Sequence, residues 1–222
     1  MFFRKIPLLA AVLSAGLAAG SAQAEEQLLI GSTSTSSSQY GYFVSVGQII
    51  NQHVDGVRSS VVETGATVDN LRRIVRGQVD MGLVTTNVGY HAYAGEGDFE
   101  GRPVDNRLLW VYSAAPQNVV MREDAGVSSI ADLEGVRLNP GITGSATEAT
   151  TVSVMETLGI APEYVRGSTT DVVAGVKDNR MAGYVKSGVG NRLDGSSMDI
   201  ATFTPIQVLS LSEEQAEQLR EQ

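Results

Sequence analysis

The stretch that decides the fold is QLLIGSTSTSSSQY, residues 27–40. It opens with a short apolar run, residues 27–31, which predicts a buried strand. Seven consecutive serine or threonine residues follow and lead into a segment whose apolar side chains recur every three or four residues. That spacing is typical of an amphipathic helix. The stretch therefore predicts a strand, a polar loop and a helix in succession, which is the repeating unit of an α/β fold.

Three further strand-to-helix loops carry small hydroxyl residues, at 64–67, 85–87 and 144–148. The expected strands are residues 27–31, 59–63, 79–84, 107–113, 117–121, 136–139, 164–165, 182–185 and 205–209. The expected helices are near residues 40–50, 68–75, 88–93, 128–135, 149–158, 172–176 and 212–220. This order predicts two α/β lobes with a cleft between them, the first over residues 25–113 and the second over 114–204.

The first 24 residues have the pattern of an export signal. Arg4 and Lys5 precede an apolar run over 6–20, and Ala22-Gln23-Ala24 gives the small-x-small pattern of a cleavage site. The apolar run is shorter than the roughly 20 residues that a membrane-spanning helix needs. We therefore expect cleavage after Ala24 and a periplasmic product, with an uncleaved membrane anchor as the alternative.

Composition excludes several classes of function. The 222 residues contain no cysteine and only two histidines, so a disulfide framework, a thiolate metal site and a cysteine nucleophile are excluded, and a multi-histidine site is disfavoured. A net charge of −9 argues against nucleic acid or an anionic lipid surface as the main partner. The G-x-S-x-G, H-E-x-x-H and P-loop motifs do not occur in the sequence. We expect a protein that is not an enzyme and uses no metal or cofactor.

The hydroxyl-rich helix starts are candidate anion sites. The first amides of a helix have no intrahelical partner and carry a partial positive charge, which suits a carboxylate or phosphate. Each start is alternatively only a helix cap, and Ser145 to Glu148 fits a capping box. The candidate cations that would help to hold an anion, each alternatively a solvated surface charge, are Arg122, Arg137, Arg166 and Lys186.

Five segments together resemble the TAXI family, the substrate-binding receptors of tripartite ATP-independent periplasmic (TRAP) transporters. They are Ile30–Thr35 followed by Tyr40, Thr64–Leu71, Gly77–Gly82, Ser128–Gly135 and Gly144–Glu148. The resemblance covers about residues 29–219. It implies a two-lobed periplasmic binding protein of type II-like α/β fold with a central cleft. Such a receptor closes on a small anionic solute, such as glutamate, glutamine or another carboxylate, and delivers it to the membrane permease subunits of a TRAP transporter.

The resemblance also implies the ligand-binding positions, which are Ser32, Thr35, Tyr40, Thr67, Thr85, Thr86, Asn87, Ser145 and Thr147. The first loop departs from the family because it is rich in serine and threonine where the family is rich in glycine, so ligand specificity does not transfer. The family continues beyond the position of Gln222 with a segment that returns to the first lobe. We therefore expect residues 205–222 to begin that return and the rest of it to be missing.

Two other functions remain open at this stage. An exported ligand-sensing module for a membrane signalling partner would use the same pocket. An exported hydrolase would need a serine or threonine beside His53 or His91.

Overall fold

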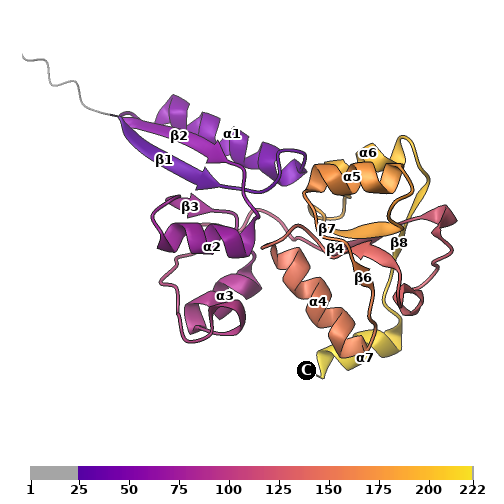
Figure 1. Cartoon of the computed structure of the whole chain (residues 1–222). Helices are drawn as coiled ribbons and strands as arrows, with labels where there is room; N and C mark the ends of the chain where they lie inside the picture. The colour runs from indigo at the N-terminus through magenta and orange to yellow at the C-terminus, as the bar shows by residue number, and fades with distance from the viewer. Residues whose placement is uncertain (1–24, 222) are drawn as a thin grey trace, which may run out of the picture.

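The computed structural model describes residues 25–221, and the expected export signal lies outside the described residues. Two α/β lobes are joined by residues 100–116, a stretch of the described chain without helix or strand (Figure 1). Within residues 25–221, no helix combines the length and apolar character needed to cross a membrane.

Within the described residues, the first lobe is built on a three-stranded parallel sheet in the order β2-β1-β3. Its strands are β1 (Glu26–Gly31), β2 (Val57–Val62) and β3 (Met81–Gly82). Its helices are α1 (Ser38–His53), α2 (Thr67–Val75) and α3 (Thr86–Ala94), followed by the short 3-10 helix η1 (Gly97–Phe99). Parallel neighbours need a crossover connection, and α1 supplies it between β1 and β2. All three strands therefore end at the same edge of the sheet.

Asn70 holds that edge together. Its side chain is fully buried, and its Nδ2 donates to the carbonyl oxygens of Gly31, Ser32 and Leu83. Its Oδ1 accepts a 2.7 Å hydrogen bond from Thr64 Oγ1. One amide group on α2 thus fixes the chain just after β1, β2 and β3, which sets the position of the loops that follow.

The second lobe has a five-stranded mixed sheet over the same described range, in the order β6-β5-β7-β4-β8. Its strands are β4 (Gln117–Arg122), β5 (Arg137–Asn139), β6 (Glu163–Tyr164), β7 (Gly183–Ser187) and β8 (Ile206–Leu209). Its helices are α4 (Ala146–Leu158), α5 (Thr169–Lys177), α6 (Gly195–Ala201) and α7 (Glu213–Arg220), with 3-10 turns η2 (Glu123–Ala125) and η3 (Ile130–Leu133). Strand β4 runs antiparallel to both β7 and β8.

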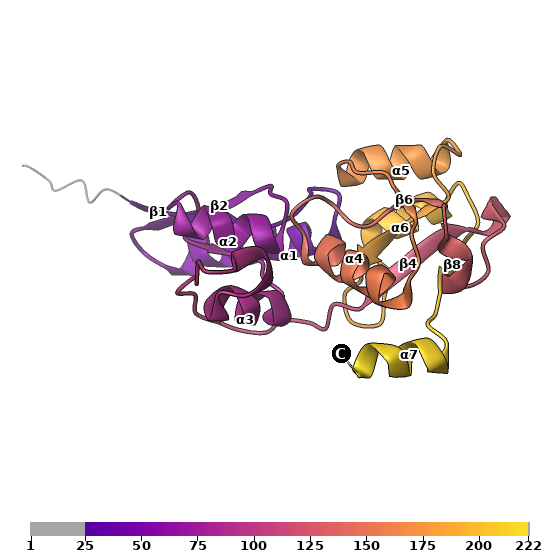
Figure 2. The same cartoon turned by 60° about the horizontal axis from the view of Figure 1, so that its bottom comes forward.

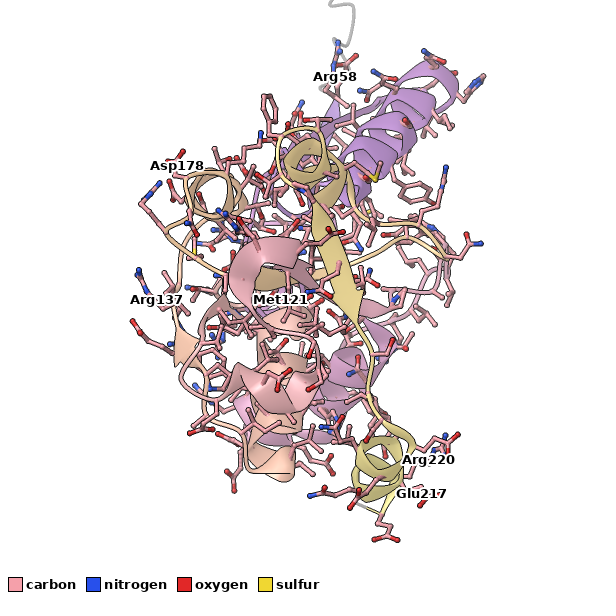
Figure 3. The ribbon with its side chains drawn as sticks, turned by 90° about the vertical axis from the view of Figure 1, so that its right-hand side faces the viewer. Arg58, Met121, Arg137, Asp178, Glu217 and Arg220 are labelled. Carbon is pink, nitrogen blue, oxygen red and sulfur yellow. The ribbon has the colours of Figure 1, made fainter. Side chains whose placement is uncertain are left out.

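Successive residues of β4 face opposite sides of this sheet, as strand geometry requires. Val120 packs with Val172 of α5 and Ile200 of α6, whereas Met121 packs with Met155 of α4. Figures 1 and 2 show α4 on one side of the sheet and α5 with α6 on the other. Met121 lies in the middle of the lobe in Figure 3. Two helical layers therefore enclose the sheet and fix the loops at its edge.

Most of the expected elements are confirmed, with shifts of a few residues at their ends. The strand expected over 107–113 is wrong: this segment pairs with no strand among the described residues, and Leu108, Leu109 and Val111 are exposed. The helix expected over 128–135 is only the 3-10 turn η3. Helix α6 was not predicted from the sequence, because Gly195-Ser196-Ser197 are weak helix formers.

The described part of the last segment, residues 205–221, lies on the second lobe, and its expected return to the first lobe stays a prediction. Strand β8 pairs with β4 in the second sheet. Helix α7 lies against α4, and Gln218 Nε2 donates to the carbonyl of Thr157 at 2.7 Å. Figure 3 shows α7, with Glu217 and Arg220 labelled, below the rest of the second lobe. In the described structure this segment therefore belongs to the second lobe.

Candidate ligand-binding site

A cavity of about 560 Å³ opens between the two lobes. That volume lies in the range of small-molecule sites, about 300–1,000 Å³. The first lobe lines it with residues 83–87 and with Ala66 and Thr67, and the second lobe with parts of 141–147 and with 184–187. Residues 110–115 of the connecting segment add a further wall. A solute in this cavity would contact both lobes.

Four helices of the described residues have their first residue on the cavity wall. They are α2 and α3 of the first lobe and α4 and α5 of the second, and residues from the start of each line the wall. Helix N-termini carry a partial positive charge and amides without an intrahelical partner. In α2 two of these amides, of Val68 and Asp69, already donate to the carbonyl of Gly144. Since all four starts face one space, their fields add there. The arrangement suits a negatively charged group.

Six of the nine predicted ligand-binding residues line the cavity: Thr67, Thr85, Thr86, Asn87, Ser145 and Thr147. Two of them also have structural roles. Thr67 Oγ1 accepts a 3.2 Å hydrogen bond from the amide of Thr85, and Ser145 Oγ accepts from the amide of Glu148 at 3.0 Å. The carboxylate of Glu148 accepts from the amide of Gly144, so the expected capping box is present only in its serine half. Whether the six residues bind a solute stays a prediction.

The other three predicted residues do not line the cavity. Ser32 is fully buried, and its Oγ has no hydrogen-bond partner among the described residues. Thr35 is exposed, and its amide donates to Glu63 at 2.9 Å. Tyr40 is half-buried elsewhere on α1. Their neighbours Thr33 and Gln39 line the cavity instead. The first loop therefore reaches the cavity through residues other than the three predicted ones.

Three buried oxygens on the cavity wall lack a hydrogen-bond partner among the described residues: Thr85 Oγ1, Gln117 Oε1 and Thr169 Oγ1. Thr85 belongs to the first lobe and Thr169 to the second. A buried polar atom without a partner costs about 1–3 kcal/mol. These atoms are therefore candidate hydrogen-bonding groups for a solute, and they come from both sides of the cavity.

The four candidate cations have different places. Arg122 is buried inside the second lobe, where it binds the carboxylate of Asp124 and the carbonyl of Val176. Arg137, which Figure 3 places at the rim of the lobe, pairs with Glu163. Arg166 pairs with Glu148 at 2.8 Å. Within the described chain only Lys186 of the four lines the cavity.

Lys186 is a buried cation. Its side chain is 12% exposed, and its Nζ lies 3.9 Å from Oδ1 of Asp194. Burial lowers the pKa of the Lys186 ammonium below its ordinary value, and the charge of Asp194 opposes that shift only in part. Burial favours the neutral amine because it removes the ammonium from water.

The lobes contact each other on both sides of the cavity. On one side Ser37 Oγ donates to Asp194 Oδ2 at 2.9 Å, and Gln39 Nε2 donates to Ser187 Oγ at 3.2 Å. On the other side the amide of Val68 donates to the carbonyl of Gly144 at 2.9 Å. Asp194 and Gln39 were not among the residues predicted from the sequence. Aspartate is a favoured N-cap residue, so Asp194 itself could have indicated that a helix begins at Gly195.

Solved structures share this fold. An alkanesulfonate-binding protein, SsuA from Xanthomonas axonopodis pv. citri bound to MOPS, is 18% identical with a TM-score of 0.55, over 84% of this chain and 61% of that one. A substrate-binding protein of an amino acid ABC transporter is 15% identical with a TM-score of 0.57, over 84% and 79%. An ABC uptake transporter substrate-binding protein from Streptococcus pneumoniae with bound histidine is 13% identical with a TM-score of 0.59, over 86% and 77%.

The chain therefore has the two-lobed α/β fold of periplasmic solute-binding proteins, as the sequence predicts. The family model described as the NMT1-like family matches residues 30–222, and the chain belongs to that family. It spans about three fifths of the length of the alkanesulfonate-binding protein that it resembles.

Proposed function

We propose that this protein is the solute-binding receptor of a TRAP-type transporter, as its resemblance to the TAXI family implies. It captures a small carboxylate or amino acid between its lobes and delivers it to the membrane permease subunits. It acts in the periplasm after export and cleavage behind Ala24. The observation that carries this proposal is the interlobe cavity, at which two helices of each lobe begin.

The contacts required for useful affinity are few. A hydrogen bond to a charged group contributes roughly 1.5–3 kcal/mol. Three to five such bonds reach about −8 kcal/mol, a micromolar dissociation constant, after the entropy of association is subtracted. The hydroxyls of Thr85, Thr147 and Thr169 on the cavity wall provide three such donors.

Ligand binding then shifts an equilibrium between open and closed lobes. A solute that touches both lobes binds the closed form better and so populates it. The permease would recognise that closed form. The cavity wall supports capture rather than catalysis, since neither histidine lines it within the described residues. His53 is exposed, and His91 pairs with Glu96 at 2.9 Å.

The test is a binding screen on the chain from Glu25 to Gln222. Isothermal calorimetry and thermal shift with dicarboxylates, oxo acids and amino acids should identify a solute that binds with micromolar affinity. Thr85→Val combined with Thr147→Val removes two cavity hydroxyls at nearly constant volume and should weaken binding at least tenfold. Thr35→Val, at an exposed position outside the cavity, is the control. A full screen without a bound solute, or a double variant with unchanged affinity, would contradict the proposal.

The transporter type has its own test. Uptake of the identified solute by membrane vesicles that contain the permease should require the purified receptor. It should stop when an ionophore dissipates the ion gradient and continue after ATP is removed. The opposite dependence would assign the receptor to an ATP-driven importer and leave its solute-binding role intact.

A further inference from the structure

The charged side chains on the described cavity wall are of one sign. Lys186 is the one charged residue among the lining residues of the described chain, and no aspartate or glutamate of residues 25–221 lines the cavity. The four helix starts add partial positive charge to the same space. The described wall of the cavity therefore carries a positive side chain and no negative one, although the whole chain has a net charge of −9.

Asp194 is already satisfied without Lys186. Its carboxylate accepts hydrogen bonds from the hydroxyls of Ser37 and Ser196 and from the amides of Ser38 and Ser196. Lys186 Nζ lies 3.9 Å away, beyond hydrogen-bond distance, and donates to no other described residue. An ammonium has three N–H donors, and a buried charge is costly unless it is paired and hydrogen-bonded. An anionic oxygen in the cavity would supply that partner.

Thr169 of α5 is a second group on the wall that can bind an anion. Helix α5 packs against β7, the strand that carries Lys186. Thr169 is 1% exposed, lines the cavity, and its Oγ1 has no partner among the described residues. Its hydroxyl can donate to an anion. A ligand ammonium, by contrast, would meet a lysine and four helix starts without a carboxylate to balance it. Gln117 Oε1, a neutral acceptor on the wall, is a better partner for a hydroxyl or an amide of a ligand than for a full positive charge.

Much of the remaining wall is apolar. These residues are Leu83, Val84, Trp110, Tyr112, Ile142, Val172 and Val185. They provide a surface for the carbon skeleton of a ligand, which loses contact with water there.

We infer that Lys186 anchors the anionic group of the solute and that the site prefers an organic carboxylate or sulfonate without an ammonium group over the corresponding amino acid. This inference rests on the proposed function and narrows its class of solute. A 2-oxo acid and an aliphatic sulfonate fit this description, whereas free glutamate does not.

Matched pairs of probes test this preference. Calorimetry compares 2-oxoglutarate with glutamate, and 4-methyl-2-oxopentanoate with leucine, since each pair differs only in an oxo or amino group. An alkanesulfonate is a third probe. In at least one pair the oxo acid should bind at least tenfold tighter than the amino acid. Lys186→Met should weaken that binding at least tenfold and Lys186→Arg by much less, while Lys177→Met, at a lysine paired with Asp199, should leave it unchanged.

The outcomes separate the inference from the proposed function. If amino acids bind as tightly as their oxo acids, or if Lys186→Met binds the oxo acid as the parent chain does, the inference is wrong and the receptor function stands. If the folded parent chain binds none of the probes or other screened solutes, both are wrong. The comparison of matched pairs needs no variant, so it remains decisive even if Lys186→Met does not fold.

Discussion

Ser37 of the first lobe donates a 2.9 Å hydrogen bond to Asp194 of the second, although 157 positions separate them in the chain. Both residues are buried, and both begin helices. The N-cap of α1 and the N-cap of α6 are therefore bonded to each other across the boundary between the lobes. The same carboxylate lies 3.9 Å from the ammonium of Lys186, so one aspartate connects the contact between the lobes to the lysine of the candidate anion site.

Ser37→Ala removes this bond and should favour the open lobes. The loss of an interlobe hydrogen bond and of an N-cap should lower the free energy of unfolding by about 1–2 kcal/mol. It should also increase the radius of gyration of the ligand-free chain in solution scattering. Ser168→Ala is the matched control, because Ser168 caps α5 within the second lobe without bonding to the first. Equal scattering from both variants would show that the Ser37 bond does not hold the lobes together.

Asn70→Leu should destabilise the first lobe strongly. The change keeps the size of the side chain but leaves the carbonyls of Gly31, Ser32 and Leu83 without their amide donor. Gly31 still accepts from the amide of Leu83 and Ser32 from the hydroxyl of Thr64, so among the described residues the carbonyl of Leu83 is the group left unsatisfied. The loss should therefore be about 1–3 kcal/mol. Urea unfolding followed by circular dichroism measures it. Asn191→Leu, at an exposed position, should change stability by less than about 0.5 kcal/mol.

Two glycines should respond in opposite directions to alanine. At Gly183 in β7 a Cβ would collide with the carbonyl oxygen of Val120 on the neighbouring strand. Gly183→Ala should therefore cost at least about 2 kcal/mol, as overpacking does. At Gly41 in α1 a Cβ meets nothing within 4 Å, so Gly41→Ala should stabilise the helix by about 0.5–1 kcal/mol. Equal effects at both positions in thermal unfolding would contradict the described register of β4 and β7.

Binding of an anion through Lys186 should depend on pH. Burial lowers the pKa of this ammonium below the ordinary lysine value of about 10.4, so deprotonation begins at a lower pH than for an exposed lysine. Because the charged form binds the anion, affinity should be constant at low pH and fall as the pH rises through that lowered pKa. Lys186→Arg should remove this alkaline loss. Calorimetry at several pH values up to about 10.5 measures it, and parallel profiles for both chains would contradict the role of Lys186.

Local signals in the sequence account for what could be predicted. Ser145 and Gly159 mark the two ends of α4 because capping depends on neighbouring residues. The hydroxyl-rich loops were found in the same way, and most of their chosen residues line the cavity. Residues 107–113 were wrongly predicted to form a strand. Alternating side chains favour a strand only where a partner strand is available to pair with it.

Long-range geometry accounts for what could not be predicted. Four cations in the second half were equal candidates in the sequence, and only pairing and burial in the folded chain distinguish Lys186 from Arg122 and Arg166. Thr33 and Gln39 line the cavity, whereas the predicted Thr35 and Tyr40 do not. Which side chains reach the cavity depends on how the first loop turns, and the run of serine and threonine does not specify that turn. The bond between Ser37 and Asp194 joins distant positions without a shared motif.

Trp110 stands on the wall of the cavity, with its ring nitrogen 2.9 Å from the hydroxyl of Tyr42. It is the sole tryptophan in the sequence and is 40% exposed. The emission spectrum of tryptophan is sensitive to the polarity around the indole. The molecule therefore carries an intrinsic fluorescent probe on the wall of the candidate binding cavity. Occupancy can therefore be followed in real time by a shift in fluorescence, without attaching a dye.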